Sequence, residues 1–166
     1  MSSDSPANRY ARQIQFAPIG SEGHQSITDS RVAILGAGAL GTVAAEILAR
    51  AGVGNLIIID RDVVEWTNLQ RQALYIEQDA IDGRSKADAS CDRLRAINGN
   101  IELHPVVADV SSGNISDILN DVDLVIDAAD NFLIRFLLND WSLKTNTPWV
   151  HGGCVGAVGQ VRQFTG

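Results

Sequence analysis

The sequence predicts an α/β fold in which a doubly wound, mostly parallel sheet carries helices on both faces. Apolar runs at 31–35 and 56–59 stop abruptly at a glycine and an aspartate, which is typical of strands buried on both faces. Segments with helical periodicity alternate with such runs, as in βαβ units. A glycine-rich turn at 36–41 follows the first run and opens a helix. Together these patterns indicate a Rossmann-like nucleotide-binding fold.

The first half of the chain divides into three parts. Residues 1 to about 8 are polar and expected to be disordered. A helical entry segment over 9–30 follows, with four apolar anchors: Ile14, Phe16, Ile19 and Ile27. The strand 31–35 leads into a helix over 39–50, which Gly52 caps, and then into a strand over 56–59. The apolar positions of this helix recur every 3.6 residues, at Leu40, Val43, Ala44, Ile47 and Leu48.

The second half alternates in the same way. The expected elements are a helix at 86–97, strands at 101–107 and 123–127, a helix at 131–144, and strands at 148–151 and 155–164. We therefore expect two parts, an N-terminal helical arm over 1–30 and a nucleotide-binding α/β domain over 31–166.

Composition and charge exclude several classes of protein. With 166 residues, 45% of them hydrophobic, the chain can form one domain with a proper core. The formal net charge of −7 argues against nucleic acid as a partner, because phosphate backbones are bound through an excess of Lys and Arg. The N-terminus lacks the features of a signal peptide, and no apolar run approaches the ~20 residues of a membrane span. Its two cysteines are far apart, so we expect a reduced, cytoplasmic protein without membrane contact.

The three glycines of the turn and the next strand end predict a nucleotide site. Gly36, Gly38 and Gly41 suit a tight turn, close approach of a phosphate to the backbone, and close helix packing. The helix N-terminus adds free N–H groups and a partial positive charge. Asp60 ends the second strand, where a carboxylate accepts hydrogen bonds from ribose hydroxyls. NAD enzymes and adenosine-binding enzymes share these features, so they do not separate the two classes.

Polar residues after the second strand favour a triphosphate. Asn68, Arg71, Gln72 and Lys86 form this group. A dinucleotide pyrophosphate is largely satisfied by backbone N–H groups, whereas a triphosphate carries more charge and calls for cationic side chains. Arg71 and Lys86 are the candidates, although each residue type is more often a surface residue. The nearby Asp62 and Glu65 are interpreted as surface charges, and the absence of a GxxxxGK[ST] loop excludes a P-loop ATPase.

Carboxylates after a later strand suggest a magnesium ligand. Asp127 and Asp130 lie at and just beyond the strand end, and Mg²⁺ binds through one or two carboxylates plus phosphate oxygens. Asp130 is the candidate, with capping of the next helix as an alternative and compatible role. Other reactive residue types are assigned no metal role: His24, His104 and His151 lack ligand spacing, Cys91 is expected in the core, and Cys154 lies in a glycine-rich loop near the site.

The ordered motifs resemble the ThiF/MoeB/HesA family, the bacterial relatives of ubiquitin-activating enzymes. They are RYARQI at 9–14, the glycine turn, NLQRQ at 68–72, GRSK at 83–86, DAADN at 127–131 and GQV at 159–161, and they cover nearly the whole chain. The resemblance implies an adenylyltransferase that binds Mg²⁺ and ATP. It would activate the C-terminal glycine carboxylate of a ubiquitin-like sulfur carrier protein as an acyl-adenylate, for sulfur incorporation into a cofactor such as thiamine or molybdopterin.

The same resemblance gives each site residue a role. Asp60 would hold the ribose, Asn68, Arg71 and Lys86 the phosphates, and Asp130 the metal; Arg12 would reach the ATP site of a neighbouring subunit, which implies a homodimer. The chemistry agrees with this set of residues. A C-terminal carboxylate has a pKa of ~3.5, so it is ionised at neutral pH and can attack the α-phosphate without a general base.

One departure from the family concerns length. Family members usually continue for about another half-domain, with paired CxxC zinc ligands, a crossover loop and, in some, a sulfur-transfer cysteine. This sequence stops at Gly166, just after the strand that would precede them. We therefore expect a fragment of a longer chain, and Zn²⁺ only if a longer C-terminal part exists.

Three alternatives remain at this point. An NAD(P)-dependent oxidoreductase explains the glycines and Asp60 but leaves Asn68, Arg71, Lys86 and Asp130 without a role. A non-catalytic half of a heterodimeric activating enzyme would typically have lost the phosphate and metal residues. A member of the superfamily could instead adenylate a non-protein carboxylate such as a modified tRNA base, which the acidic charge disfavours.

Overall fold

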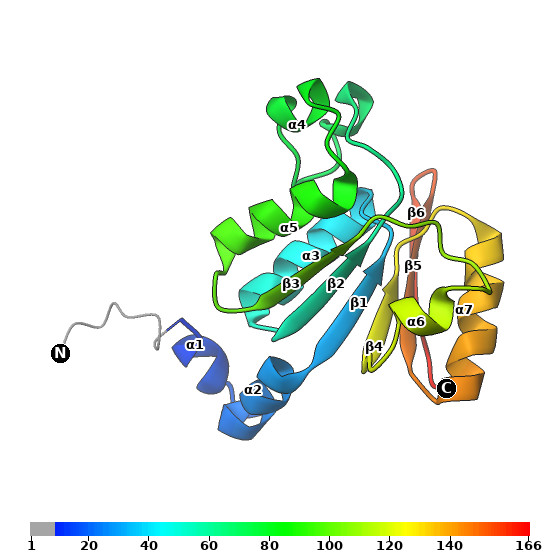
Figure 1. The fold of residues 1–166 in the computed structure, drawn as a ribbon. Helices are drawn as coiled ribbons and strands as arrows, with labels where there is room; N and C mark the ends of the chain where they lie inside the picture. The colour runs from blue at the N-terminus through cyan, green and yellow to red at the C-terminus, as the bar shows by residue number, and fades with distance from the viewer. Residues whose placement is uncertain (1–8) are drawn as a thin grey trace.

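One six-stranded sheet organises the chain, in the order β3-β2-β1-β4-β5-β6 (Figure 1). This computed structural model describes residues 9–166, so the segment expected to be disordered, 1–8, lies outside the described residues. The strands are β1 Arg31–Leu35, β2 Asn55–Ile59, β3 Glu102–Val106, β4 Leu124–Asp127, β5 Trp149–Val155 and β6 Val158–Phe164. Neighbouring strands from β3 to β5 are parallel, and β6 is antiparallel to β5. The predicted doubly wound, mostly parallel sheet is confirmed.

Helices cover both faces of this sheet. The helices of the described residues are α1 Ala11–Ile14, α2 Gly20–Asp29, α3 Ala39–Ala51, α4 Glu77–Ile81, α5 Lys86–Ile97, α6 Ile115–Ile118 and α7 Phe132–Thr145, with a 3₁₀ turn, η2, at Trp66–Asn68. Helices α3 and α5 lie on one face, and α6 and α7 lie on the other (Figure 1). Across residues 9–166, every helix is too short or too polar to cross a membrane.

The apolar strand runs are continuous because both faces of the central strands are covered. In β1, Val32 and Ile34 pack into the core beneath α3 and α5, while Ala33 and Leu35 pack into the core beneath α6 and α7. Side chains alternate between the faces of a strand, so a strand with two covered faces needs apolar residues at every position. This explains why the sequence places β1 and β2 to within one residue.

The inner face of α3 differs from the one that periodicity predicts. Leu40, Val43 and Ile47 are exposed, and the buried positions are occupied by small residues, Gly41, Thr42, Ala45 and Ala49. Small side chains let α3 lie close to the sheet; of the larger predicted residues Leu48 packs against the core, and the other three are left on the outer side of the helix. Phe16, predicted as an anchor of the entry segment, is also exposed. The molecule therefore carries an apolar surface over α3 that its own core does not use.

Gly52 ends α3, and its replacement tests whether this helix end requires glycine. It caps the helix with φ +89°, and a Cβ there would lie 2.6 Å from the ring of Tyr10. Gly83 also has a positive φ, +59°, but nothing lies within 4 Å of the position of its Cβ. We predict that Gly83→Ala lowers the free energy of unfolding by about 1 kcal/mol through backbone strain alone. Gly52→Ala should cost about 2–4 kcal/mol, because the clash adds to the strain.

Urea denaturation of both variants measures this difference. Equal losses in Gly52→Ala and Gly83→Ala would mean that the Tyr10 ring moves aside at no cost.

Candidate functional site

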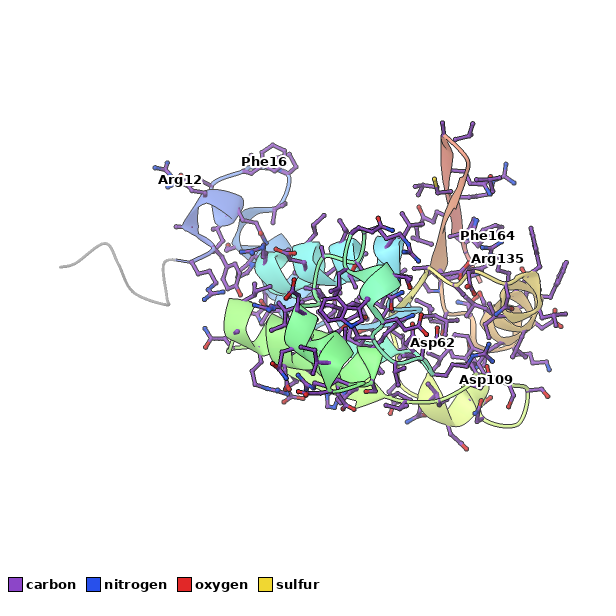
Figure 2. The ribbon with its side chains drawn as sticks, turned by 90° about the horizontal axis from the view of Figure 1, so that it is seen from above. Arg12, Phe16, Asp62, Asp109, Arg135 and Phe164 are labelled. Atoms are coloured by element: carbon purple, nitrogen blue, oxygen red, sulfur yellow. The ribbon has the colours of Figure 1, made fainter. Side chains whose placement is uncertain are left out.

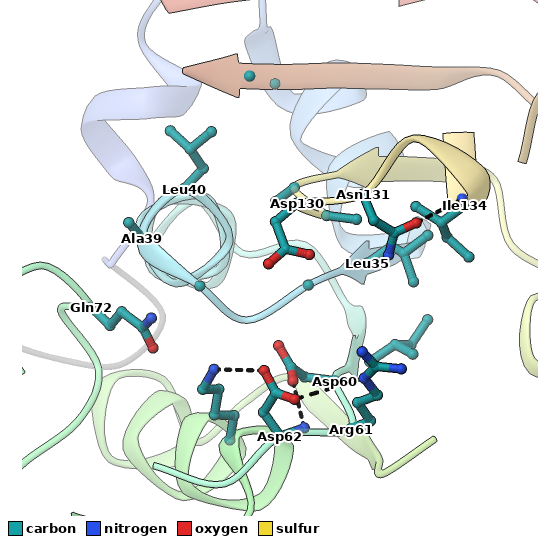
Figure 3. A pocket seen from close by; sticks show the side chains of 18 of the residues that line it. Leu35, Ala39, Leu40, Asp60, Arg61, Asp62, Gln72, Asp130, Asn131 and Ile134 are labelled. Carbon is teal, nitrogen blue, oxygen red and sulfur yellow. Dashed lines mark hydrogen bonds and ion pairs between the residues drawn. The ribbon is translucent and has the colours of Figure 1, made fainter. Parts of the chain in front are cut away.

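The carboxyl ends of three neighbouring strands meet in one row. Leu35, the last residue of β1, is in register with Ile59 of β2 and with Asp127 of β4. The next residues continue the row, because the Gly36 N–H donates to the Ile59 carbonyl at 2.9 Å and the Ala128 N–H donates to the Leu35 carbonyl at 2.9 Å. The chain leaves β1 toward β2 on one side and returns as β4 on the other, which opens a crevice at this point. A pocket of about 860 Å³ occupies it (Figure 3).

The three glycines of the turn have different surroundings. Gly36 has φ +96°, and a Cβ there would lie 2.8 Å from the Ala128 carbonyl oxygen. A Cβ on Gly41 would lie 1.8 Å from the Gly36 carbonyl oxygen, so Gly41 lets α3 begin directly against the turn. Gly38 lines the pocket, and nothing lies within 4 Å of the position of its Cβ. Gly36 and Gly41 thus build the turn, whereas Gly38 leaves its pocket side open.

Asp60 joins the glycine turn to the end of β2. Its Oδ2 accepts a hydrogen bond from the Ala37 N–H at 2.7 Å, and its Oδ1 accepts one from the Asp62 N–H at 2.8 Å. Each carboxylate oxygen has a second lone pair for a further donor. Asp60 also lines the pocket (Figure 3), so it can accept hydrogen bonds from hydroxyl groups of a ligand there.

Lys86 brings a positive charge to the same wall. It is the first residue of α5 and is 7% exposed, and its Nζ lies 3.0 Å from Asp62 Oδ2. Asp62, interpreted as a surface charge, is indeed exposed, and it also lines the pocket and pairs with Lys86.

The segment of η2 supplies the remaining polar wall. Asn68 is buried, and its Oδ1 accepts the Glu65 N–H at 2.9 Å. Its carbonyl accepts the N–H groups of Arg71 and Gln72, at 3.1 and 2.9 Å. Arg71 is exposed at the pocket, and the buried Gln72 Oε1 has no hydrogen-bond partner within the described part of the chain. Such a buried acceptor is expected to have a partner, so it suits a pocket that holds a polar ligand or water.

Asp130 reaches the pocket from the loop that follows β4. The side chain of Asn131 caps α7 instead, with its Oδ1 accepting the Ile134 N–H at 3.0 Å, so the alternative capping role of Asp130 is wrong. Asp127 is fully buried; its Oδ1 accepts the Ala129 N–H at 3.0 Å, and its Oδ2 lies 2.7 Å from His151 Nδ1. Through these two contacts Asp127 stabilises the loop that follows β4. Asp130 remains exposed at the pocket wall.

The arrangement fits a magnesium ion only together with a phosphate ligand. Within residues 9–166, no group of three or more His, Cys, Asp and Glu is placed to hold a metal by itself. Mg²⁺ needs only one or two carboxylates when phosphate oxygens supply the other ligands. In Figure 3, Asp130 lies on one side of the glycine turn, and Asp60 and Asp62 lie on the other. Asp130 is therefore a suitable single carboxylate ligand.

The pocket gathers most of the predicted site residues. Its lining includes Gly36, Gly38, Asp60, Asn68, Arg71, Gln72, Lys86 and Asp130. Gly41 does not line the pocket and packs against the Gly36 carbonyl. Arg12 on α1 is exposed and lies far from Asp62 and the pocket (Figure 2). Of the predicted residues, then, Arg12 does not reach the site of its own chain.

The two cysteines are expected to differ in reactivity. Cys154 is exposed and lines the pocket, whereas Cys91 is buried, and burial raises the pKa of its thiol to about 12. Since the thiolate is the nucleophile, Cys91 stays protonated and unreactive between about pH 7 and pH 9. We predict that a disulfide reagent such as Ellman's reagent modifies one thiol per folded chain, and that Cys154→Ser abolishes this reaction. Two equivalent fast reactions in the folded protein would contradict the burial of Cys91.

Comparisons with known proteins agree on one family. The sequence pattern of the ThiF family matches residues 10–166. The chain is 48% identical to the sulfur carrier protein ThiS adenylyltransferase of Bacillus subtilis (strain 168) over 151 residues, which are 91% of this chain and 45% of that protein. It is 39% identical to the molybdopterin-synthase adenylyltransferase of Escherichia coli (strain K12) over 163 residues, which are 98% of this chain and 65% of that protein.

A solved structure has the same fold. The crystal structure of E. coli MccB with AMPCPP and MccA superposes with a TM-score of 0.86 at 26% identity, over 97% of this chain and 49% of that one. The chain thus spans about half the length of the relatives with which it shares this fold.

Proposed function

Because the chain belongs to the ThiF family, we propose that it forms the ATP site of an adenylyltransferase that activates the C-terminal carboxylate of a ubiquitin-like sulfur carrier protein. One observation carries the proposal: a single pocket joins the glycine turn, the Asp60 carboxylate, the cations Arg71 and Lys86, and the Asp130 carboxylate. An NAD site would use the first two features. The cations and the second carboxylate are suited to a triphosphate and its metal ion.

Different residues would bind the ribose and the phosphates of the nucleotide. Asp60 would accept the ribose hydroxyls, and the N–H groups at the start of α3 would bind phosphate oxygens. Arg71, Lys86 and the side-chain amide N–H groups of Asn68 and Gln72 would bind the phosphate chain. Lys86 pairs with Asp62, and a phosphate would compete for its ammonium group. The Lys86–Asp62 pair would therefore keep the lysine ordered in the pocket.

The reaction requires positioning rather than a base. The ionised terminal carboxylate of the carrier attacks the α-phosphorus of ATP, and the bond from that phosphorus to the bridging oxygen of pyrophosphate breaks. Arg71 and Lys86 would stabilise the negative charge that develops on the leaving pyrophosphate. Mg²⁺ held by Asp130 would supply further neutralisation of phosphate charge. No proton has to be removed, because a terminal carboxylate with a pKa of ~3.5 is already ionised.

We further propose that the protein acts as a homodimer. Arg12 projects from α1 beside the exposed Phe16 (Figure 2), and the outer face of α3 carries exposed Leu40, Val43 and Ile47. Contiguous apolar surface of this kind favours burial against a protein partner. A second copy seated there would carry its own Arg12 toward the neighbouring ATP site. An ATP-dependent activity also fits the cytoplasmic location expected from the sequence.

Carrier-dependent exchange of pyrophosphate into ATP tests the reaction. The chain, with Mg²⁺, is offered a panel of ubiquitin-like carriers ending in Gly-Gly, with a reaction lacking carrier and an NAD(H) titration as controls. Exchange with one carrier supports adenylation and identifies the partner and the pathway. Binding of NAD(H) in place of ATP would overturn the proposal. Binding of ATP without exchange would restrict the activity of this chain to nucleotide binding.

A further inference from the structure

Tyr75 makes buried contacts on the far side of the glycine turn from the pocket. Its side chain is 7% exposed, and its hydroxyl donates a hydrogen bond to the Ala37 carbonyl at 2.7 Å. The same hydroxyl lies 3.2 Å from Ser90 Oγ and 3.4 Å from the Lys86 carbonyl oxygen, both on α5. Burial raises the pKa of Tyr75, so the hydroxyl keeps the proton that it donates. One side chain thus connects the glycine turn to the first turns of the helix that begins at Lys86.

The carbonyl that Tyr75 holds belongs to the peptide between Ala37 and Gly38. In a trans peptide the carbonyl and the N–H of the next residue point in opposite directions. With the Ala37 carbonyl directed inward to Tyr75, the Gly38 N–H is directed outward, toward the pocket that Gly38 lines. The preceding peptide is fixed as well, because the Ala37 N–H donates to Asp60 Oδ2 at 2.7 Å. Both peptides that flank Ala37 are therefore held by side chains.

We propose that Tyr75 is a positioning residue for phosphate binding, which holds the Gly38 N–H and the start of α5 in the arrangement that a phosphate chain requires. This inference rests on the proposed function, since it assumes that phosphates lie against the glycine turn. Tyr75 does not line the pocket, and it acts through the Ala37–Gly38 peptide. Its ring is part of the core beneath α3 and α5, and the hydroxyl supplies the positioning.

Tyr75→Phe isolates the hydroxyl, and the chain offers a matched control. Its other tyrosine, Tyr10, accepts a hydrogen bond from Asn98 Nδ2 at 2.7 Å near the opposite end of α5. We expect Tyr75→Phe to weaken the binding of Mg²⁺-ATP by ~5–15-fold, the range for loss of one buried hydrogen bond, and to leave adenosine binding within ~2-fold of wild type. Tyr10→Phe should leave the binding of both ligands unchanged.

Calorimetric titration of the purified chain with ATP and with adenosine gives these constants, and thermal unfolding of each variant reports its fold. Unchanged ATP affinity in Tyr75→Phe would overturn the inference and leave the ATP site intact. Equal losses for ATP and adenosine would also overturn it, because they indicate a general structural role. Failure of the wild-type chain to bind ATP would overturn the proposed function itself.

Ser90→Ala keeps the test decisive if Tyr75→Phe does not fold. It removes the contact between the Tyr75 hydroxyl and α5 while leaving the bond to Ala37. We expect a smaller loss in the same direction, ~2–3-fold for ATP and none for adenosine. Unchanged ATP binding in a folded Ser90→Ala variant would overturn the proposed coupling to α5.

Discussion

Replacement of Lys86 by Ala should lower kcat/KM for carrier-dependent exchange by ~30–1,000-fold, or about 2–4 kcal/mol of transition-state stabilisation. The ammonium group of Lys86 lies in a largely enclosed wall, with its side chain 9% exposed, where water screens its charge poorly. Lys86→Ala removes the charge that would oppose the growing negative charge on pyrophosphate. We expect the loss to appear more in kcat than in the KM for ATP, because the charge on the leaving group grows in the transition state.

Lys144→Ala is the matched control for this variant. Lys144, the only other lysine of the chain, is exposed in the last turn of α7, so its removal should leave the rate unchanged. The fold of Lys86→Ala should persist, because the Asp62 carboxylate that loses its partner is 56% exposed and can be solvated. A near-normal rate in Lys86→Ala would remove this lysine from the mechanism. We expect Arg71→Ala to lower kcat/KM by a factor of the same order, and a near-normal rate would likewise remove Arg71 from the mechanism.

The sequence predicted which strand ends meet, because topology determines it. Buried strands leave continuous apolar runs, and their ends are marked by Gly36, Asp60 and Asp127. In a parallel sheet these ends must lie on one edge, so a correct assignment of strands already brings the flanking residues together. The start of α5 at Lys86 was predicted from the helical periodicity over 86–97, and the structure adds the Ser85 cap before it.

Contacts made by the irregular segments could not be predicted in this way. The path from Arg61 to Ser85 contains only short elements, η2 and α4, which have too few residues for a periodicity to register. The pairing of Asp62 with Lys86 and the reach of Tyr75 under the glycine turn depend on that path. The inner face of α3 was predicted only in part, with Leu48 correct, for another reason: a helix that lies close to a sheet buries small residues, whereas hydrophobic periodicity points to the large ones.

Gly41→Ala should prevent folding or lower the free energy of unfolding by about 3 kcal/mol or more. Alanine in a helix is favoured over glycine by about 1 kcal/mol, so propensity alone predicts the opposite sign. The added Cβ would lie 1.8 Å from the Gly36 carbonyl oxygen, a backbone atom of a residue that is held in place by the hydrogen bond from its N–H to the Ile59 carbonyl. Overpacking against backbone costs more than the gain in propensity. Urea denaturation of the wild type and of Gly41→Ala measures the change in the free energy of unfolding, and its sign shows whether overpacking or helix propensity is the larger effect.

Gly38→Ala, three residues earlier, should show the reverse behaviour. No atom lies within 4 Å of the position of its Cβ, and its φ of −84° is open to any residue, so stability should change by less than about 1 kcal/mol. The new methyl group would occupy the open pocket side, where close approach of a phosphate is proposed, and ATP affinity should fall at least ~10-fold. A stable Gly38→Ala variant that binds ATP normally would show that the phosphates lie elsewhere. A stable Gly41→Ala variant would show that the turn and α3 can separate, and that the close packing of α3 is not what sets the geometry of the site.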